Sequence, residues 1–101
     1  MIVYNSTIKV DVSIAAEWLH WLQHEQAPQM LATGLFSKFQ VLQLLQTDDT
    51  DGPTYAVQFF AASLGDFEDY LAHHAEHFRL EAAERWGGDF IAFNTVMQVV
   101  V

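Results

Sequence analysis

Cysteine is absent from the 101-residue sequence, and basic residues are scarce. Without cysteine, the chain can form neither a disulfide framework, nor a thiolate metal site, nor a cysteine nucleophile. Only 4 Lys and Arg residues stand against 13 Asp and Glu residues, which gives a net charge of −9 at pH 7. Because that charge repels phosphate groups and anionic membranes, we expect neither nucleic acid nor a membrane as a partner.

Long hydrophobic runs are missing as well. No stretch approaches the ~18 apolar residues that a membrane span needs. The first ten residues lack the basic start and apolar centre of a secretory signal, so we expect a soluble, cytoplasmic protein. With 51% hydrophobic residues, the chain is nevertheless able to build one packed core. We therefore expect a single domain over residues 1–101.

Hydrophobic periodicity divides the sequence into strands and helices. Strands are predicted over residues 2–10, 35–47, 55–62 and 89–101, and long helices over residues 13–26 and 66–86. Pro28 is expected to end the first helix, because the residue before a proline avoids the α region. A short helical turn is expected after it, over residues 28–34. This β-α-β-β-α-β order predicts an α+β, ferredoxin-like fold, with both helices on one face of a four-stranded antiparallel sheet.

The last two predicted strands are apolar on both faces. In the third strand Val57 and Phe59 oppose Ala56 and Phe60, and the fourth strand repeats this pattern. Two helices can cover only one face, and a bare apolar face of roughly 400 Å² is unusual in a monomer. We therefore predict a homodimer that stacks sheet on sheet, as in a dimeric α+β barrel.

The second predicted helix combines an apolar stripe with histidines. The stripe has helical spacing and is expected to be ordinary core: Leu64, Phe67, Leu71, Ala75, Phe78, Ala82 and Trp86. His73 and His77 lie one turn apart with Glu81 a turn further on, a spacing that metal sites use. No further ligand is dictated by the sequence, so we expect a solvated helix flank that binds metal only adventitiously, and no cofactor.

His74 lies at the edge of this stripe, beside Tyr70. At the rim of a cleft, a histidine can act as a general base or anchor a ligand, or it can simply contact water. Trp18 and Trp21 of the first helix are expected to converge with Tyr70 and His74, because both helices pack on one sheet face. We predict that a small apolar or aromatic ligand binds there, and a cavity of roughly 300 Å³ reaching His74 would support that prediction.

Five segments of the sequence resemble a small bacterial family of unknown function. They are I-V-Y-N-x-T (residues 2–7), E-W-L-x-W (17–21), P-x-M-L-A-T-G-x-F (28–36), T-Y-A-V-Q-F (54–59) and F-I-A-F-x-T (90–95). That family is similar to the dimeric α+β-barrel superfamily, which includes small monooxygenases, haem-degrading enzymes, isomerases and dehalogenating decarboxylases. The resemblance implies ferredoxin-like subunits that pair through their sheets.

The sequence departs from that family at four polar positions. Gln26 stands where the family has a histidine before the proline, and Glu76 replaces the proline that follows His74-Ala75. Ala82 and Asn94 replace a further histidine and an arginine of the last strand. If these positions form a family site, the resemblance implies that only His74 survives from it.

Three functions therefore stay open. A ligand-binding module without catalysis is favoured, because the sequence has no G-x-S-x-G motif, no cysteine and no glycine-rich phosphate loop. The second is a cofactor-free small enzyme, similar to a monooxygenase or isomerase, that uses His74 as its base. The third is an interaction module whose acidic surface binds a basic partner, and only the net charge of −9 points to it.

Overall fold

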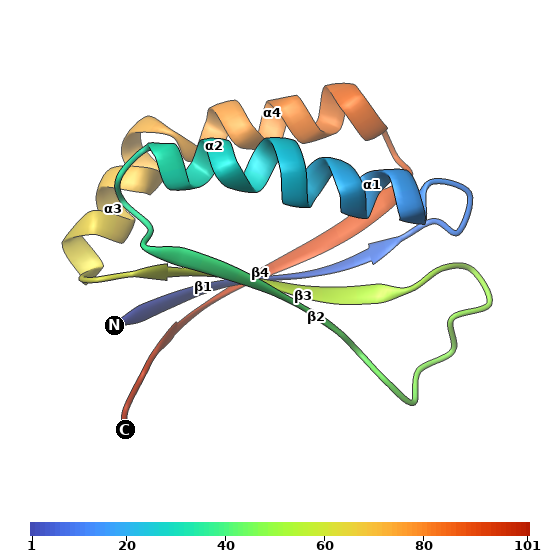
Figure 1. Cartoon of the computed structure of the whole chain (residues 1–101), viewed down its shortest axis with the longest axis horizontal. Helices are drawn as coiled ribbons and strands as arrows, with labels where there is room; N and C mark the ends of the chain where they lie inside the picture. The colour runs from blue at the N-terminus through green and yellow to red at the C-terminus, as the bar shows by residue number, and fades with distance from the viewer.

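The computed structural model describes all residues from 1 to 101. Its elements are β1 (Ile2–Val10), α1 (Ala15–Trp21), a π-helical segment (Leu22–Gln26), α2 (Ala27–Ala32), β2 (Lys38–Gln43), β3 (Thr54–Ala61), α3 (Leu64–His73), α4 (Ala75–Trp86) and β4 (Phe90–Gln98). The four strands form one antiparallel sheet, and all helices lie on one of its faces (Figure 1). The predicted α+β, ferredoxin-like fold is confirmed.

The strand order is β2-β3-β1-β4, so β1 is a central strand that pairs with both β3 and β4. Alternate residues of each strand point to the helices, as the period of two requires. In β3, Tyr55, Val57, Phe59 and Ala61 are buried under the helices, whereas the residues between them are only half-buried. The two-faced pattern predicted for this strand is therefore present in the fold.

The core between the helices and the sheet is rich in aromatic rings. At one end, Tyr4 packs against Phe67 and Tyr70, with ring centroids 5.2 Å and 5.7 Å away. At the other end, Trp18 stacks on Tyr55 at 5.6 Å, and Trp21 meets Trp86 edge-on at 5.8 Å. These contacts join the helices to β1, to β3 and to one another.

Pro28 does not end the first helix, contrary to prediction. The helical path runs from Ala15 to Ala32, and the π-helical segment lies just before the proline. At the end of this wide turn the Ala27 N–H donates to the carbonyl of Leu22, five residues back. We attribute the continuity to this wider turn, because it relieves the i→i−4 ladder where a proline ring would clash and where its N–H is missing.

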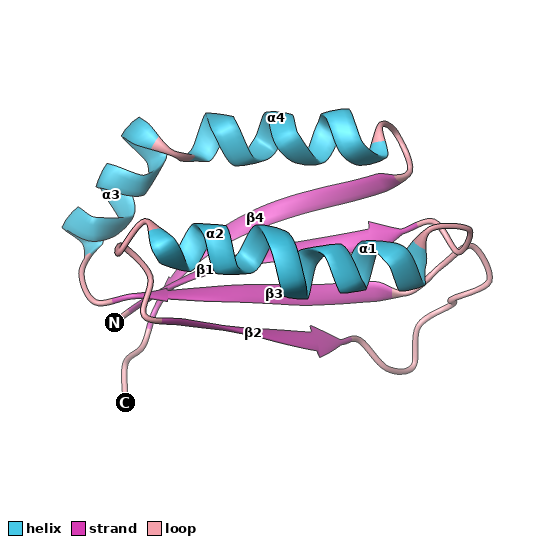
Figure 2. Cartoon of the chain, turned by 45° about the horizontal axis from the view of Figure 1, so that its top comes forward, coloured by secondary structure: helices cyan, strands magenta, loops and turns pink.

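The second predicted helix is divided into two, because the helical conformation is interrupted at His74. This residue has φ −131° and ψ −30°, outside helical values, and α3 and α4 meet there at an angle (Figure 2). The break changes which residues face the core. Leu64 and Leu71 of the predicted stripe are 53% and 50% exposed, while Tyr70 is 2% exposed. Their assignment to the core was wrong, but Phe67, Phe78 and Trp86 are buried as predicted.

Two predicted strands were too long. β2 begins at Lys38 and ends at Gln43, and β4 ends at Gln98. The chain between β2 and β3 is a loop that docks on the end of β1, where the Val10 N–H donates to the Pro53 carbonyl at 3.0 Å. None of the helices is both long and apolar enough to cross a membrane.

The outer face of the sheet is not covered by any element. This outer face consists of the strand residues whose side chains point away from the helices. None of these residues is Asp or Glu. Leu42, Ile91, Phe93 and Met97 are exposed on this outer face. A short polar row crosses it, because Gln40 donates to Gln58 at 2.7 Å and Gln58 donates to Asn5 at 3.3 Å.

Candidate functional site

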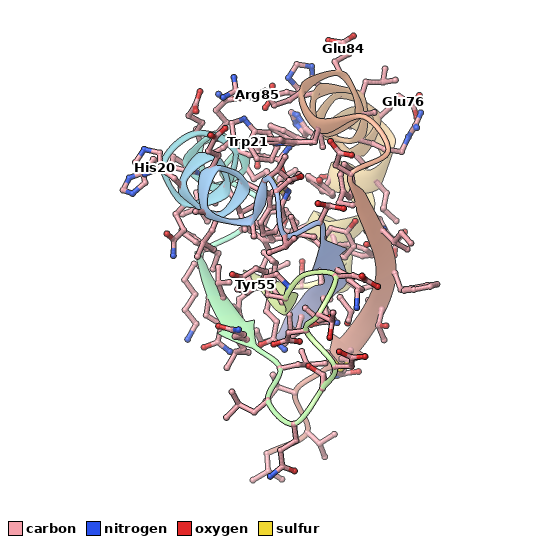
Figure 3. All side chains as sticks on the ribbon, turned by 90° about the vertical axis from the view of Figure 1, so that its right-hand side faces the viewer. His20, Trp21, Tyr55, Glu76, Glu84 and Arg85 are labelled. Atoms are coloured by element: carbon pink, nitrogen blue, oxygen red, sulfur yellow. The ribbon has the colours of Figure 1, made fainter.

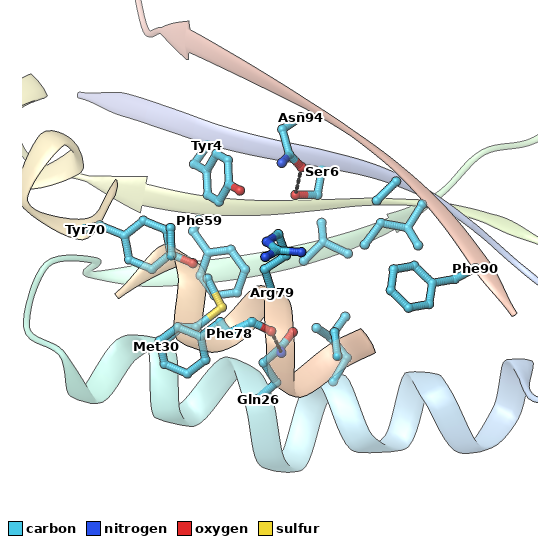
Figure 4. Close-up of a pocket in the computed structure, with 16 residues that line it drawn as sticks. Tyr4, Ser6, Gln26, Met30, Phe59, Tyr70, Phe78, Arg79, Phe90 and Asn94 are labelled. Carbon is cyan, nitrogen blue, oxygen red and sulfur yellow. Dashed lines mark hydrogen bonds between the residues drawn. The ribbon is translucent and has the colours of Figure 1, made fainter. Parts of the chain in front are cut away.

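A cavity of about 140 Å³ lies between α4 and the sheet. It is lined by 16 residues, of which 12 are hydrophobic (Figure 4). The helix that runs through the π-helical segment forms one wall, α4 forms another, and inward residues of β1, β3 and β4 form the floor. The cavity is smaller than the roughly 300 Å³ that we expected of a ligand site, and its lining does not include His74. Its size matches a single aromatic ring, since an apolar cavity of about 150 Å³ holds benzene.

Small side chains explain why this space stays open. α4 presents Ala75 and Ala82 to the cavity, and the sheet presents Ser6 and Ala92. Close-packed interiors need larger side chains to fill the distance between a helix and a sheet. The larger rings of Phe59, Phe78 and others complete the walls without filling the centre.

Gln26 joins two walls of the cavity. It is the last residue of the π-helical segment and is only 9% exposed. Its side-chain amide donates to the carbonyl oxygen of Phe78 at 3.2 Å, which links the first helix to α4 (Figure 4). A buried amide of this kind needs such a partner, because an unpaired polar group in the core is costly. The π-helical segment thus places one polar group at an otherwise apolar wall.

Three further polar side chains reach the cavity from other elements. Ser6 of β1 donates to the Asn94 side-chain oxygen of β4 at 2.8 Å. Arg79 of α4 is the only charged residue of the lining. Its guanidinium lies 2.7 Å from a carboxylate oxygen of Glu76, on the exposed side of the helix. The polar groups of the cavity are therefore few and lie among hydrophobic walls, as in most sites for small molecules.

Two tyrosine hydroxyls also point into the cavity (Figure 4). Burial raises the pKa of Tyr70 far above its ordinary value of about 10, and the neighbouring Tyr4 adds to the rise. Burial likewise raises the pKa of Tyr4, although the Ser6 hydroxyl partly offsets this. Both phenols are consequently neutral at physiological pH, and each can donate or accept a hydrogen bond.

The structure brings together only two of the four predicted ligand-binding residues. Tyr70 lines the cavity, and His74 stacks on its ring with centroids 6.4 Å apart. His74 is half-buried but lies outside the cavity lining. Trp18 and Trp21 lie at the other end of the core, where Trp21 points from α1 toward α4 (Figure 3). The expected convergence does not occur, and a ligand role for Trp18, Trp21 and His74 stays a prediction.

The histidines with metal-like spacing lie on separate helices. His73 ends α3 and His77 lies in α4, so the break at His74 separates them. The His77 Nε2 lies 3.5 Å from an oxygen of Glu81. Three or more metal-ligating side chains do not gather anywhere in the structure. Adventitious metal binding at His73 and His77 stays untested.

Sequence reasoning did not select Ser6, Arg79 or the phenol of Tyr4 as site residues. A signal existed for two of the cavity residues: Ser6 interrupts an otherwise apolar inward row of β1, and Asn94 lies between Ala92 and Val96 in the inward row of β4. Three of the four departures from the resembled family, at Gln26, Ala82 and Asn94, also line this one cavity. Arg79 gave no signal, because a Glu-Arg pair three residues apart on a helix is typical of a solvated surface.

Comparison with known proteins finds one family over almost the whole chain. The family profile described as "Domain of unknown function (DUF4286)" matches residues 1–100. No curated protein matches the sequence.

Solved structures with a similar fold have little sequence identity. One is a protein of Deinococcus radiodurans, provisionally assigned as an antibiotic biosynthesis monooxygenase. It is 15% identical, with a TM-score of 0.68 over 100% of this chain and 94% of that one. Another, from Arabidopsis thaliana, is 13% identical, with a TM-score of 0.66 over 100% of this chain and 99% of that one. At such identities the likeness concerns the fold alone.

Proposed function

The chain belongs to the DUF4286 family of domains of unknown function, and we propose that it binds a small apolar or aromatic molecule in the cavity between α4 and the sheet. The observation that carries this proposal is the cavity itself, about 140 Å³ in size and lined mostly by hydrophobic side chains. Burial of a ring there removes apolar surface from water at roughly 25 cal/mol per Å². The few polar groups of the lining would orient the bound molecule.

Benzyl alcohol is a suitable neutral probe, because its ring has the size of the cavity. We expect it to shift the amide resonances of Tyr4, Phe78 and Ala92 in a nuclear magnetic resonance titration, and the effect should saturate. The variant Ala82→Leu fills the cavity from α4 and should weaken binding about tenfold or more, because the ring would then clash with a side chain.

Ala83→Leu provides the matched control. Ala83 is exposed, lies next to Ala82 on α4, and does not line the cavity. This variant should bind benzyl alcohol as the unmodified chain does. If the probe causes no saturable shifts, or if the two variants bind it equally, the proposed ligand site is wrong.

We include catalysis by His74 only as a secondary hypothesis. Its half-buried ring stacks on Tyr70, one residue that faces the cavity, but the imidazole itself lies outside the lining. A general base must come within hydrogen-bond reach of the proton it removes. The geometry therefore supports ligand binding better than a cofactor-free reaction at His74.

We also propose that two copies of the chain pair through the outer face of the sheet. Support comes from the exposed Leu42, Ile91, Phe93 and Met97, which form part of an apolar surface that no helix covers. The charges of this face do not oppose pairing by burying a carboxylate. The chain carries a net charge of −9, yet the outer face contains two lysines, Lys9 and Lys38, and no carboxylate.

Two copies that meet through this face keep their acidic surfaces apart. In this arrangement the acidic groups of the two copies repel each other only weakly. Salt ions screen charges that lie more than roughly 10 Å apart at 0.1 M salt. We also propose that the protein is cytoplasmic, as expected from the sequence.

A further inference from the structure

We infer that the ligand of this cavity is a small carboxylic acid bound as its anion, with an apolar or aromatic body inside and the carboxylate at Arg79. This inference rests on the proposed ligand site and specifies its chemistry. Neither the family description nor the fold assigns it. Three observations carry it: the charge of the lining, the arrangement of its hydrogen-bond donors, and its size.

The charge of the lining is unlike that of the rest of the chain. Acidic residues outnumber basic ones by 13 to 4 in the sequence. The 16 lining residues nevertheless include no Asp or Glu, and their one charged member is Arg79. A carboxylate that enters the cavity would therefore meet a cation with no competing anion inside. The net charge of the whole chain, by contrast, repels anions.

Arg79 is available to a second carboxylate although it contacts Glu76. The pair uses one guanidinium nitrogen, at 2.7 Å from the Glu76 oxygen, and both side chains are largely exposed. An exposed ion pair of this kind contributes little to stability, so it does not hold the arginine firmly. A guanidinium carries five N–H donors, and the remaining edge can bind a carboxylate with two parallel hydrogen bonds.

Asn94 supplies a second donor from the sheet side. Its side-chain oxygen accepts the hydrogen bond from Ser6 at 2.8 Å. This bond orients the amide, and its NH₂ group stays available to donate to a ligand. Figure 4 shows Asn94 and Ser6 on the strand side and Arg79 on the α4 side of the same cavity. Donors thus flank the polar part of the cavity, and a carboxylate, which only accepts, complements them.

The size of the cavity limits the rest of the molecule. About 140 Å³ accommodates one six-membered ring or a short branched chain. Phe59, Phe78 and the ring of Tyr70 would contact its faces and edges. Benzoate, with one ring and one carboxylate, is the simplest probe with this chemistry, and benzyl alcohol is its neutral counterpart of nearly equal shape.

The test compares the dissociation constants of both probes by isothermal titration calorimetry at 0.15 M salt. We expect the unmodified protein to bind benzoate about tenfold more tightly than benzyl alcohol, because a charge-assisted hydrogen bond is roughly twice as strong as a neutral one. Arg79→Gln should remove this preference, because benzoate then loses its charged partner and benzyl alcohol loses no ionic contact. The substitution is at an exposed side chain and should not affect folding, which circular dichroism can verify.

Arg85→Gln is the matched control, since it removes the same charge from the same helix. Arg85 stacks on Trp86, with its guanidinium carbon 5.1 Å from the ring centroid, and does not line the cavity. This variant should keep the preference for benzoate. The inference is overturned if benzoate and benzyl alcohol bind the unmodified protein equally. It is also overturned if both arginine variants weaken benzoate to the same extent, because that result would indicate only a long-range charge effect.

The two proposals fail in different ways. If benzyl alcohol binds but benzoate has no advantage, the ligand site stands and the carboxylate inference is wrong. If neither probe binds, the ligand site itself is wrong and the inference falls with it.

Discussion

Tyr70 connects the core of the molecule to the candidate site. Its ring packs against Phe36 at 4.8 Å and Tyr4 at 5.7 Å, and its hydroxyl faces the cavity. Because the side chain is almost fully buried, ionisation would place a charge in a medium that solvates it poorly. The raised pKa of Tyr70 is the result, and it links stability to pH.

The pH dependence follows from the direction of this shift. The folded state keeps the Tyr70 proton above pH 10, where the phenol of the unfolded chain has lost it. The unfolded state then binds fewer protons, so the stabilisation is fully present below pH 10 and is lost as pH rises beyond it. For one phenol with a folded pKa well above 11, the loss at pH 11 is about 1.4 kcal/mol.

Tyr70→Phe should therefore lower the alkaline sensitivity of the protein. Urea unfolding at pH 8 and pH 11 measures the difference: between these values the variant should lose about 1.4 kcal/mol less than the unmodified chain. If the two proteins lose stability in parallel, the Tyr70 hydroxyl is not buried as described.

At the scale of elements, the loop between β2 and β3 depends on one glycine. Gly52 has φ +145°, and a Cβ atom there would overlap the carbonyl oxygen of Val10. Next to it, the Val12 N–H donates to the backbone carbonyl of Asp51 at 2.8 Å, which holds the loop to the end of β1. Only glycine combines this backbone conformation with such a close approach.

Gly52→Ala should lower the free energy of unfolding by about 2 kcal/mol or more, because the backbone must move to admit a methyl group. Gly88→Ala is the control, since open space surrounds that position. It should change stability by no more than about 0.5 kcal/mol. Thermal unfolding of both variants measures the effect, and equal losses would contradict the close contact at Gly52.

Element order was predictable from the sequence, but the two interruptions of the helices were not. Periodicity identified four strands and their two faces because it records which residues avoid water. The helix continues through Pro28 after a π-helical turn, and the helical conformation is interrupted at His74. Neither is encoded in a local pattern, so Leu71 was assigned to the core in place of Tyr70.

The candidate site was less predictable for the same reason. Tyr70 was selected because it is aromatic and lies near a histidine, and it does face the cavity. The remaining polar groups come from β1, the first helix, α4 and β4, which meet only in the folded chain. Trp18 and Trp21 share a helix face with Leu22, yet they pack at the far end of the core. The spacing of residues in a sequence shows which face of a helix they occupy. It does not show which part of the neighbouring strands or helices they contact.

At the scale of the whole molecule, pairing through the outer face of the sheet can be tested by the mass of the protein in solution. One chain has a mass of 11.5 kDa, and light scattering at micromolar concentration should give about twice this value. Phe93, 69% exposed on the edge strand β4, lies on the proposed contact surface. Phe93→Asp should yield a folded monomer, because pairing would bury an unpaired carboxylate.

Leu71→Asp is the control for this experiment. Leu71 is also exposed, but it lies on α3, on the helix side of the sheet. This variant should keep the mass of the unmodified protein. A single-chain mass for the unmodified protein, or an unchanged mass for Phe93→Asp, would rule out pairing through the outer face.

The central place of β1 in the sheet has a consequence for the order of assembly in time. β1 is the first strand of the chain, yet its neighbours are β3 and β4, so Ile2 pairs with Ala61 on one side and with Gln98 on the other. Closing such large loops costs entropy before any contact compensates for it. A nascent chain therefore cannot complete its sheet from the N-terminus onward. We expect β1 to stay unpaired until its distant partners emerge from the ribosome, so that folding is late, concerted and slower than that of a helical bundle of equal length.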